Sequence, residues 1–345
     1  MIHDRESTDR IVCATAAMTD TRFPTWDPLG YDTPLPLERT FFPLGFPLDI
    51  RTNSAEVLAA AETSWPERAG AFSEPRLRLQ VLAEAGDDHP PPPPPRYRAQ
   101  GKVLCLAADS RHLAACDLER AKAVCWVSAA LAANRTPFRY HYLEGIVYCL
   151  LSYLRLTPVH ASCVASGGRG VLLSGPPGTG KSCLAYACAK AGLTFVSDDV
   201  GYLLRADPGS RLLGRPHFLR LRPSALALFR ELQGTPVGAD VGGEPIIEIR
   251  LDGLEGMTTA PGCVATAVVF LERRPDSPAV LSGVDAPAAL DLLVRELPVA
   301  SEAVNREQVA SIERLVRRGA YRLTYSGLPT AVDRIRELLE SIARA

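Results

Sequence analysis

The residues with the clearest chemistry form one glycine-rich stretch in the middle of the chain. Gly175 to Ser182 reads GPPGTGKS, which satisfies the pattern G-x-x-x-x-G-K-[ST] in full. In such a loop the glycines let successive backbone N–H groups turn inward around an anion. Lys181 adds a positive charge between the β- and γ-phosphates, and the Ser182 hydroxyl is a hard oxygen ligand for Mg²⁺. The stretch predicts a phosphate-binding loop with ATP and Mg²⁺ as ligands.

The sequence on either side of this loop is the context that a phosphate loop requires. Val171–Ser174 reads as a buried strand, and Ser182–Ala191 reads as a helix that stops at Gly192. The positive end of that helix would point at the phosphates. The predicted nucleotide-binding residues are the loop and the residue after it: Gly175, Pro176, Pro177, Gly178, Thr179, Gly180, Lys181, Ser182 and Cys183.

Two adjacent carboxylates follow the next predicted strand, Leu193–Ser197. Asp198 and Asp199 stand seventeen and eighteen residues beyond Lys181. Phosphoryl transfer needs a carboxylate that orients and deprotonates the attacking hydroxyl, and a metal ion and a lysine that neutralise charge. Two carboxylates at the end of one strand can divide these roles, whereas the alternative for the pair is a solvated turn. A second acid that follows an apolar strand is Glu272.

The string GPPGTGKS is also common in AAA+ ATPases, so that class is an alternative. An AAA+ module needs a hydrophobic strand that ends in an acidic pair further along the chain, together with an arginine finger. Residues 237–251 offer only Pro245-Ile246-Ile247-Glu248-Ile249, with no acidic pair at the end of the strand. The acidic pair close to the loop favours a kinase.

The block from His160 to Asp199 resembles the catalytic domain of HPr kinase/phosphorylase and the wider group of HPr-kinase-like serine kinases. In that family a histidine lies fifteen residues before the first loop glycine, and His160 stands there relative to Gly175. A glycine ends the loop helix, as Gly192 does. A short strand then delivers an Asp-Asp pair, where Asp198 and Asp199 fall.

The resemblance implies an α/β fold with a P-loop kinase core of the HPr-kinase/PEP-carboxykinase-like type. It implies that Asp199 is the base, that Asp198 and Ser182 hold the metal ion, and that His160 lies beside the transferred phosphoryl group. With Lys181 these complete the predicted catalytic set. The implied activity is ATP-dependent transfer to a hydroxyl, a serine of a protein or peptide. The alternatives are a small-molecule hydroxyl, such as that of a free amino acid, and an ATP-binding regulatory module without kinase activity. Rings are known in this family, so a homo-oligomer is compatible with the resemblance.

The chain departs from the family pattern in places that matter for the activity. Pro176 and Pro177 replace a more polar pair, and Cys183 stands where Glu is usual. The family's Leu-Glu-Ile-Arg-Gly stretch supplies a magnesium-binding glutamate, but its nearest counterpart here has Arg220 and Arg222 in place of the acid. The resemblance therefore does not carry over dephosphorylation or HPr as the substrate. The two arginines could reach phosphates or form an exposed basic edge, and both interpretations stay open.

The elements that must position these residues divide the chain into two predicted domains. Residues 1–156 read as a smaller α+β domain without recognisable chemistry, and 157–345 as the catalytic domain. Pro90–Pro95 are six consecutive prolines, which predict a stiff polyproline II surface loop or a ligand for a proline-binding module. Tyr140–Leu156 has helical spacing, and Tyr321–Tyr325 reads as an edge strand.

Composition excludes several classes of function and partner. With 345 residues and a formal net charge of −1, the chain has no field that would gather nucleic acid. No stretch approaches the roughly 20 apolar residues of a membrane span, and the N-terminal apolar run is too short for a secretory signal. The nine cysteines are scattered singly, which predicts reduced thiols and a cytoplasmic location.

Overall fold

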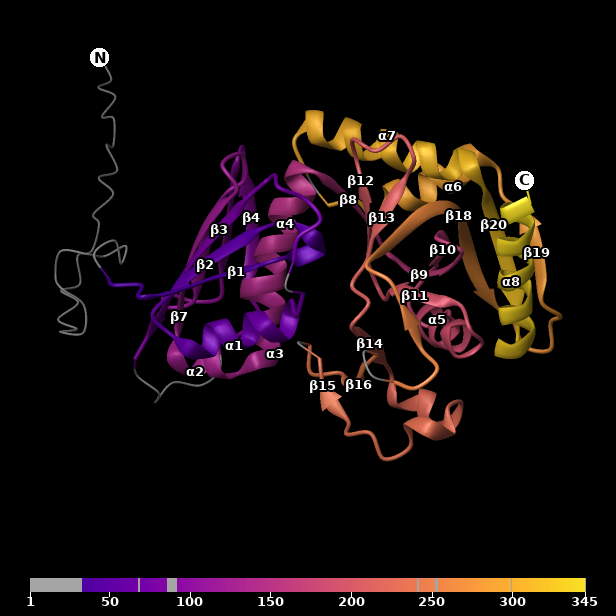
Figure 1. The fold of residues 1–345 in the computed structure, drawn as a ribbon, viewed down its shortest axis with the longest axis horizontal. Coiled ribbons are helices and arrows are strands. Elements are labelled where there is room, and N and C mark those ends of the chain that lie inside the picture. The colour runs from indigo at the N-terminus through magenta and orange to yellow at the C-terminus, as the bar shows by residue number, and fades with distance from the viewer. Residues whose placement is uncertain are drawn as a thin grey trace, which may run out of the picture.

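Three sheets organise the part of the chain that the computed structural model describes: residues 33–67, 69–85, 92–240, 242–251, 254–298 and 300–344. Two of the sheets combine parallel and antiparallel pairs, so the protein is a mixed α/β structure (Figure 1). The seven-stranded sheet is formed by the front part of the chain. The ten-stranded sheet carries the glycine-rich loop, and a small three-stranded sheet lies at the bottom centre of Figure 1, below the ten-stranded sheet.

The front sheet has the strand order β1-β2-β3-β7-β6-β5-β4. Its core pairs β2–β3 and β3–β7 are parallel, and the others are antiparallel. Its strands are β1 (Leu37–Phe41), β2 (Leu48–Thr52), β3 (Leu77–Glu84), β4 (Arg96–Gln100), β5 (Val103–Ala107), β6 (Leu113–Asp117) and β7 (Lys122–Ser128). Its helices are α1 (Ala55–Ser64), α2 (Ala129–Ala133), α3 (Arg135–Pro137) and α4 (Gly145–Leu154), and a π-helical segment, Phe138–Glu144, leads into α4.

The helix expected in the front part lies where the sequence pattern predicts it. The helical spacing of Tyr140–Leu156 corresponds to the π-helical segment and to α4, whose apolar residues are buried. Ser54 is the N-cap of α1 by position but makes no cap hydrogen bond. The neighbouring Asn53 side chain bonds instead to the backbone of Ala83, which ties the start of α1 to β3. In the proline run, Pro90 and Pro91 lie outside the described residues, and the last four prolines precede β4.

The second sheet has the order β17-β11-β9-β10-β18-β13-β12-β8, with β20 beside β18 and β19 beside β20. Strand β10 lies between antiparallel β9 and parallel β18. The strands are β8 (Leu156–Val159), β9 (Ala161–Ser166), β10 (Arg169–Ser174), β11 (Thr194–Ser197), β12 (Gly201–Leu204), β13 (Arg211–Leu213), β17 (Thr258–Thr259), β18 (Gly262–Arg273), β19 (Val280–Gly283) and β20 (Ala320–Tyr325).

Alternate residues of the central strands enter two separate apolar cores, because successive side chains of a strand point to opposite faces. On β10, Val171 and Leu173 join the core on the side of α5 (Lys181–Lys190) and α8 (Leu328–Arg344). Leu172 joins the core on the side of α6 (Ala286–Val294) and α7 (Glu302–Arg318). Covering both faces with helices explains why the predicted buried strand reads as a continuous apolar run.

Two strand predictions in this sheet are wrong in detail. Tyr321–Tyr325 is not at an edge, because β20 pairs with β18 on one side and β19 on the other. The apolar pattern of Val159–Ser166 also predicts a single strand, but the structure breaks it at His160. The chain before the break, β8, pairs with β12, whereas β9 pairs with β10 and β11. His160 therefore lies at the point where the chain changes partners.

The third sheet, β14-β16-β15, consists of β14 (Phe218–Leu221), β15 (Gly238–Ala239) and β16 (Pro245–Arg250). The front core also contains Tyr202 and Leu213 of the second sheet, so the two parts of the chain share buried apolar contacts. The domain boundary at 156/157 remains a prediction. Within the described part of the chain, no helix combines the length and apolar character that crossing a bilayer requires. The eight cysteines there are unbridged, and Cys13 lies outside it.

Candidate active site

The glycine-rich loop connects β10 to α5 and depends on left-handed backbone at Gly175, Gly178 and Gly180, whose φ angles are 150°, 87° and 94°. Gly180 is the N-cap of α5. A Cβ atom added there would lie 2.7 Å from the Tyr325 hydroxyl oxygen, and one at Gly175 would lie 3.1 Å from the backbone oxygen of Leu271. Both backbone angle and space therefore require glycine at these two positions.

The loop is also held by side chains. The Tyr325 hydroxyl donates a hydrogen bond to the backbone oxygen of Thr179 at 2.7 Å, and the Thr179 hydroxyl donates to that of Pro176 at 2.8 Å. Lys181 Nζ lies 2.6 Å from the backbone oxygen of Gly175. Partial burial lowers the pKa of Lys181, while the charges of nearby carboxylates oppose that shift. The lysine is thus at the centre of the loop, with acidic groups around it.

Asp198 and Asp199 follow β11 and have opposite environments. Asp198 is only 7% exposed. One of its oxygens accepts from the Ser162 hydroxyl at 3.0 Å and the other from the backbone N–H of Arg220 at 3.1 Å. Burial raises the pKa of Asp198, and a hydrogen bond from Ser182 opposes the rise. Asp199 has a left-handed φ of 62° and a side chain that is 63% exposed.

His160 joins Asp199 to a third carboxylate. Its Nε2 lies 3.2 Å from Asp199 Oδ1, and its Nδ1 lies 3.3 Å from Oε2 of Glu296. The hydrogen bond between His160 and Asp199 raises the pKa of His160 and lowers that of Asp199. This pairing favours the ionised form of Asp199 and the protonated form of the imidazole.

The four residues predicted as catalytic are therefore brought together. Lys181, Asp198 and Asp199 are close enough to influence one another's ionisation, His160 contacts Asp199, and Ser182 contacts Asp198. This arrangement follows from topology, because the loop after β10 and the turn after β11 are at the same end of the sheet.

The two arginines left open by the sequence do not present free side chains to this site. The Arg220 guanidinium pairs with Glu248 at 2.9 Å, since the register of β14 and β16 places the two residues opposite each other. Arg222 lies 3.7 Å from Glu244 in an exposed pair. Arg220 contacts the aspartate pair through its backbone N–H alone among the hydrogen bonds described.

Glu272, the second acid that follows an apolar strand, lies elsewhere, and so do Asn305, Arg306 and Arg250. Glu272 pairs with Arg274 at 2.6 Å and accepts from Thr324. Arg306 on α7 pairs with Glu302 on an exposed helical face, and its neighbour Asn305 is exposed too. The Arg250 guanidinium lies over the ring of Phe218 at 5.7 Å.

Four residues near the site were missed by sequence reasoning: Ser162, Arg215, Glu296 and Tyr325. The position of Ser162 could have indicated its role, because it lies only two residues after His160 in the sequence. Glu296 and Tyr325 had none, since they follow the loop by more than a hundred residues. Arg215 influences Asp199 through its charge, and its backbone N–H contacts the Ser197 hydroxyl at 3.4 Å.

The donor set fits a magnesium ion bound together with phosphates. Ser182 offers a hydroxyl, and Asp198 offers a buried carboxylate whose charge is costly without a cation beside it. Mg²⁺ is usually held by one or two carboxylates plus phosphate oxygens and water. No cluster of three or more His, Cys, Asp or Glu side chains suited to a metal ion occurs among the described residues.

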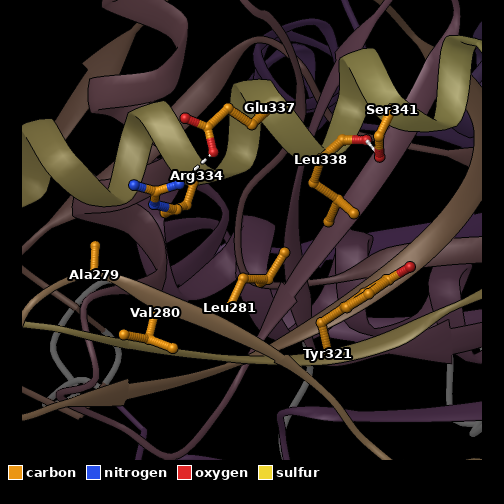
Figure 2. A pocket seen from close by; sticks show the side chains of 8 residues that line it. All are labelled: Ala279, Val280, Leu281, Tyr321, Arg334, Glu337, Leu338 and Ser341. Carbon is orange, nitrogen blue, oxygen red and sulfur yellow. Dashed lines mark hydrogen bonds and ion pairs between the residues drawn. The ribbon is translucent and has the colours of Figure 1, made fainter.

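A separate groove of about 530 Å³ lies between β19, β20 and α8 and shares no residue with the loop (Figure 2). In that view Arg334 and Glu337 on α8 face each other above the side chains of β19 and β20. Its lining residues are Ala279, Val280, Leu281, Tyr321, Arg334, Glu337, Leu338 and Ser341.

Comparisons with known proteins give little beyond the fold. No protein-family model matches the chain, and no curated protein matches it. Among solved structures, one match is the Hpr(Ser) kinase/phosphatase from Coxiella burnetii, at 13% sequence identity and a TM-score of 0.31. The match covers 54% of this chain and 95% of the other. It is a distant resemblance of fold, and at this score it carries no argument about activity.

Proposed function

We propose that this protein is an ATP-dependent, Mg²⁺-requiring kinase that phosphorylates a hydroxyl group, a serine of a protein or peptide. The observation that carries the proposal is the convergence of Lys181, a buried Asp198 and an exposed Asp199 paired with His160. A phosphate loop alone is common to many ATPases. A second, accessible carboxylate beside it is what a hydroxyl acceptor requires.

The two aspartates have different roles in this proposal because their surroundings differ. Buried Asp198 and the Ser182 hydroxyl would hold Mg²⁺, which neutralises charge on the phosphates when it is bound. Asp199 is exposed and is kept ionised by His160. It accepts the proton of the acceptor hydroxyl while the hydroxyl oxygen bonds to the γ-phosphorus and the bond from that phosphorus to ADP breaks.

The experiment that tests the proposal begins with Asp199→Asn. Asparagine tolerates the left-handed backbone of this position about as well as aspartate does, so the turn is preserved. We expect phosphoryl transfer to be abolished and ATP binding to persist. Transfer is measured by mass spectrometry of a cell extract incubated with the protein, Mg²⁺ and labelled ATP. Full activity in the variant would overturn the assignment of the base.

A second variant tests the loop lysine, which is expected to contribute to both ATP binding and phosphoryl transfer. Lys181→Ala removes the loop cation, and we expect it to weaken both ATP binding and transfer, the latter by about 10²- to 10³-fold. Lys190→Ala is the matched control, because Lys190 is on the same helix and pairs with Glu231 at its far end. The control should bind ATP like the unaltered protein.

Two alternative functions also include an ATP site at this loop. A small-molecule acceptor, such as a free amino acid, is separated from a protein acceptor by the same mass-spectrometric screen. An ATP-dependent regulatory module is favoured by one feature, the arginine at position 220 where the resembled family has a metal-binding acid. Phosphate release without a phosphorylated product, with a partner whose affinity differs between ATP and ADP, would identify that function. A cytoplasmic location and homo-oligomers remain predictions.

A further inference from the structure

Glu296 contributes a carboxylate to the site that the proposed reaction does not use. It lies two residues beyond the end of α6, and its Oε2 is 3.3 Å from Nδ1 of His160. The opposite ring nitrogen of His160 faces Asp199 at 3.2 Å. The imidazole therefore lies between two carboxylates, one from the turn after β11 and one from the connection between α6 and α7.

A single contact would leave the His160 ring poorly defined. His160 lies at the break between β8 and β9, and its side chain is 37% exposed. Packing against neighbouring residues therefore restricts the ring only partly. With Asp199 alone, the ring could turn about its Cβ–Cγ bond and lose the contact. A partner on Nδ1 fixes the ring plane and determines which nitrogen carries a proton towards Asp199.

We propose that Glu296 is a positioning residue of the active site, which holds the His160 ring so that Nε2 faces the carboxylate of Asp199. This inference rests on the proposed function, because Asp199 is the base there. The charged groups that face His160 are Asp199, Glu296 and Lys181. Glu296 makes no described hydrogen bond or ion pair with the loop or the aspartate pair, and its direct contact is with His160, although its charge also acts on Lys181.

This role gives the C-terminal half of the chain a part in the chemistry. Glu296 follows α6, which packs with α7 against β18 and β10 in a core on the face of the sheet opposite the loop helix. The rigid packing of that face fixes the position from which the carboxylate reaches over to His160. When the contacts that position a catalytic group are removed, the reaction rate falls even though substrate binding is retained.

The test compares Glu296→Ala and Glu296→Gln with Glu302→Ala. Glutamine keeps an oxygen that can accept from Nδ1, whereas alanine removes it. Glu302 is a matched control because it is a nearby acid in an exposed pair with Arg306. Both glutamates are on the surface, so all three variants should fold. The first readout is the pair of ring-nitrogen chemical shifts of His160, measured by NMR in the protein without nucleotide.

We expect Glu296→Ala to move the Nδ1 shift of His160, Glu296→Gln to move it less, and Glu302→Ala to leave it unchanged. In the transfer assay Glu296→Ala should lower kcat by about 10- to 100-fold with KM for ATP unchanged, and glutamine should restore part of the loss. An unchanged Nδ1 shift, or an unchanged kcat, would overturn the proposal. Since the NMR readout needs no activity, a shifted nitrogen in a protein that transfers no phosphate would refute the kinase function and leave the contact established.

Discussion

The aspartate pair shows how one residue step along the chain can produce two kinds of carboxylate. Asp198 is buried, and burial raises its pKa. Asp199 is exposed, and its hydrogen bond to His160 lowers its pKa. The left-handed φ of Asp199 turns the two side chains into different surroundings. In the proposed function this separation suits a metal ligand and an acceptor-facing base, because the surroundings of each carboxylate set how readily it ionises.

The pairing of His160 with Asp199 predicts a pH-dependent contribution to stability. The pKa of His160 is raised above 6.5, so its contribution is complete below that pH and is lost as pH rises through the raised value. The pKa of Asp199 is lowered below 3.8, so its contribution is lost only as pH falls through the lowered value. The pair therefore stabilises the fold fully between 3.8 and 6.5.

The measurement is urea unfolding of the protein and of His160→Gln, without nucleotide or Mg²⁺. Because both side chains are partly exposed, the difference in free energy of unfolding should not exceed about 1 kcal/mol. It should be largest near about pH 5 and smaller near about pH 9. A difference that stays constant over this range would show that the ion pair is not what the histidine contributes.

At the scale of elements, the loop is not held by its own residues alone. Strand β20 lies beside β18, and its last residue, Tyr325, reaches the loop through its hydroxyl. The same hydroxyl occupies the space that a side chain at position 180 would need. The strand order of the sheet therefore links the C-terminal part of the chain to the shape of the phosphate loop.

Tyr325→Phe removes this hydrogen bond with little change in shape. One such bond is worth about 0.5–1.5 kcal/mol, so ATP affinity should fall by about 2- to 10-fold. Isothermal titration calorimetry with ATP and Mg²⁺ would measure it. Tyr321→Phe, on the same strand, is the control and should bind normally. Equal affinity in the Tyr325 variant would mean that the loop keeps its shape without the strand.

At the scale of the whole molecule, a buried ion cluster joins the front part of the chain to the part that carries the glycine-rich loop. Glu144, from the π-helical segment, is 5% exposed. It lies 2.9 Å from Arg215 and 3.1 Å from Arg139. Arg215 follows Gly214, where an added Cβ atom would lie 2.1 Å from the backbone oxygen of Val196. Through Glu144, the front part thus contacts Arg215, whose neighbour Gly214 packs against β11, the strand that ends at the aspartate pair.

Removing the carboxylate with Glu144→Ala leaves two arginines without their buried partner. We expect the free energy of unfolding to fall by about 3–5 kcal/mol, together with reduced phosphoryl transfer. Glu62→Ala is the control, because Glu62 is half exposed and its pair with Arg39 should be worth about 1 kcal/mol or less. Chemical denaturation measures both. Similar losses in the two variants would contradict a central role for the cluster.

The sequence by itself determined the features that depend on residues close to one another along the chain. The loop, its glycines and its lysine are readable because a phosphate nest needs certain residue types at fixed neighbouring positions. The helix and strand that flank it follow from short-range apolar patterns. The aspartate pair was within reach because it follows the next predicted strand, whereas His160, within forty residues of the pair, was predicted from the family resemblance.

Only the tertiary structure decided what surrounds these groups. Glu296, Tyr325 and Glu144 reach the site or its supports from distant segments, and no spacing along the chain encodes such contacts. Their positions depend on the order of strands in the sheet and on which helix covers which face. It was also the strand register that paired the Arg220 side chain with Glu248, a partner that residue type alone could not predict.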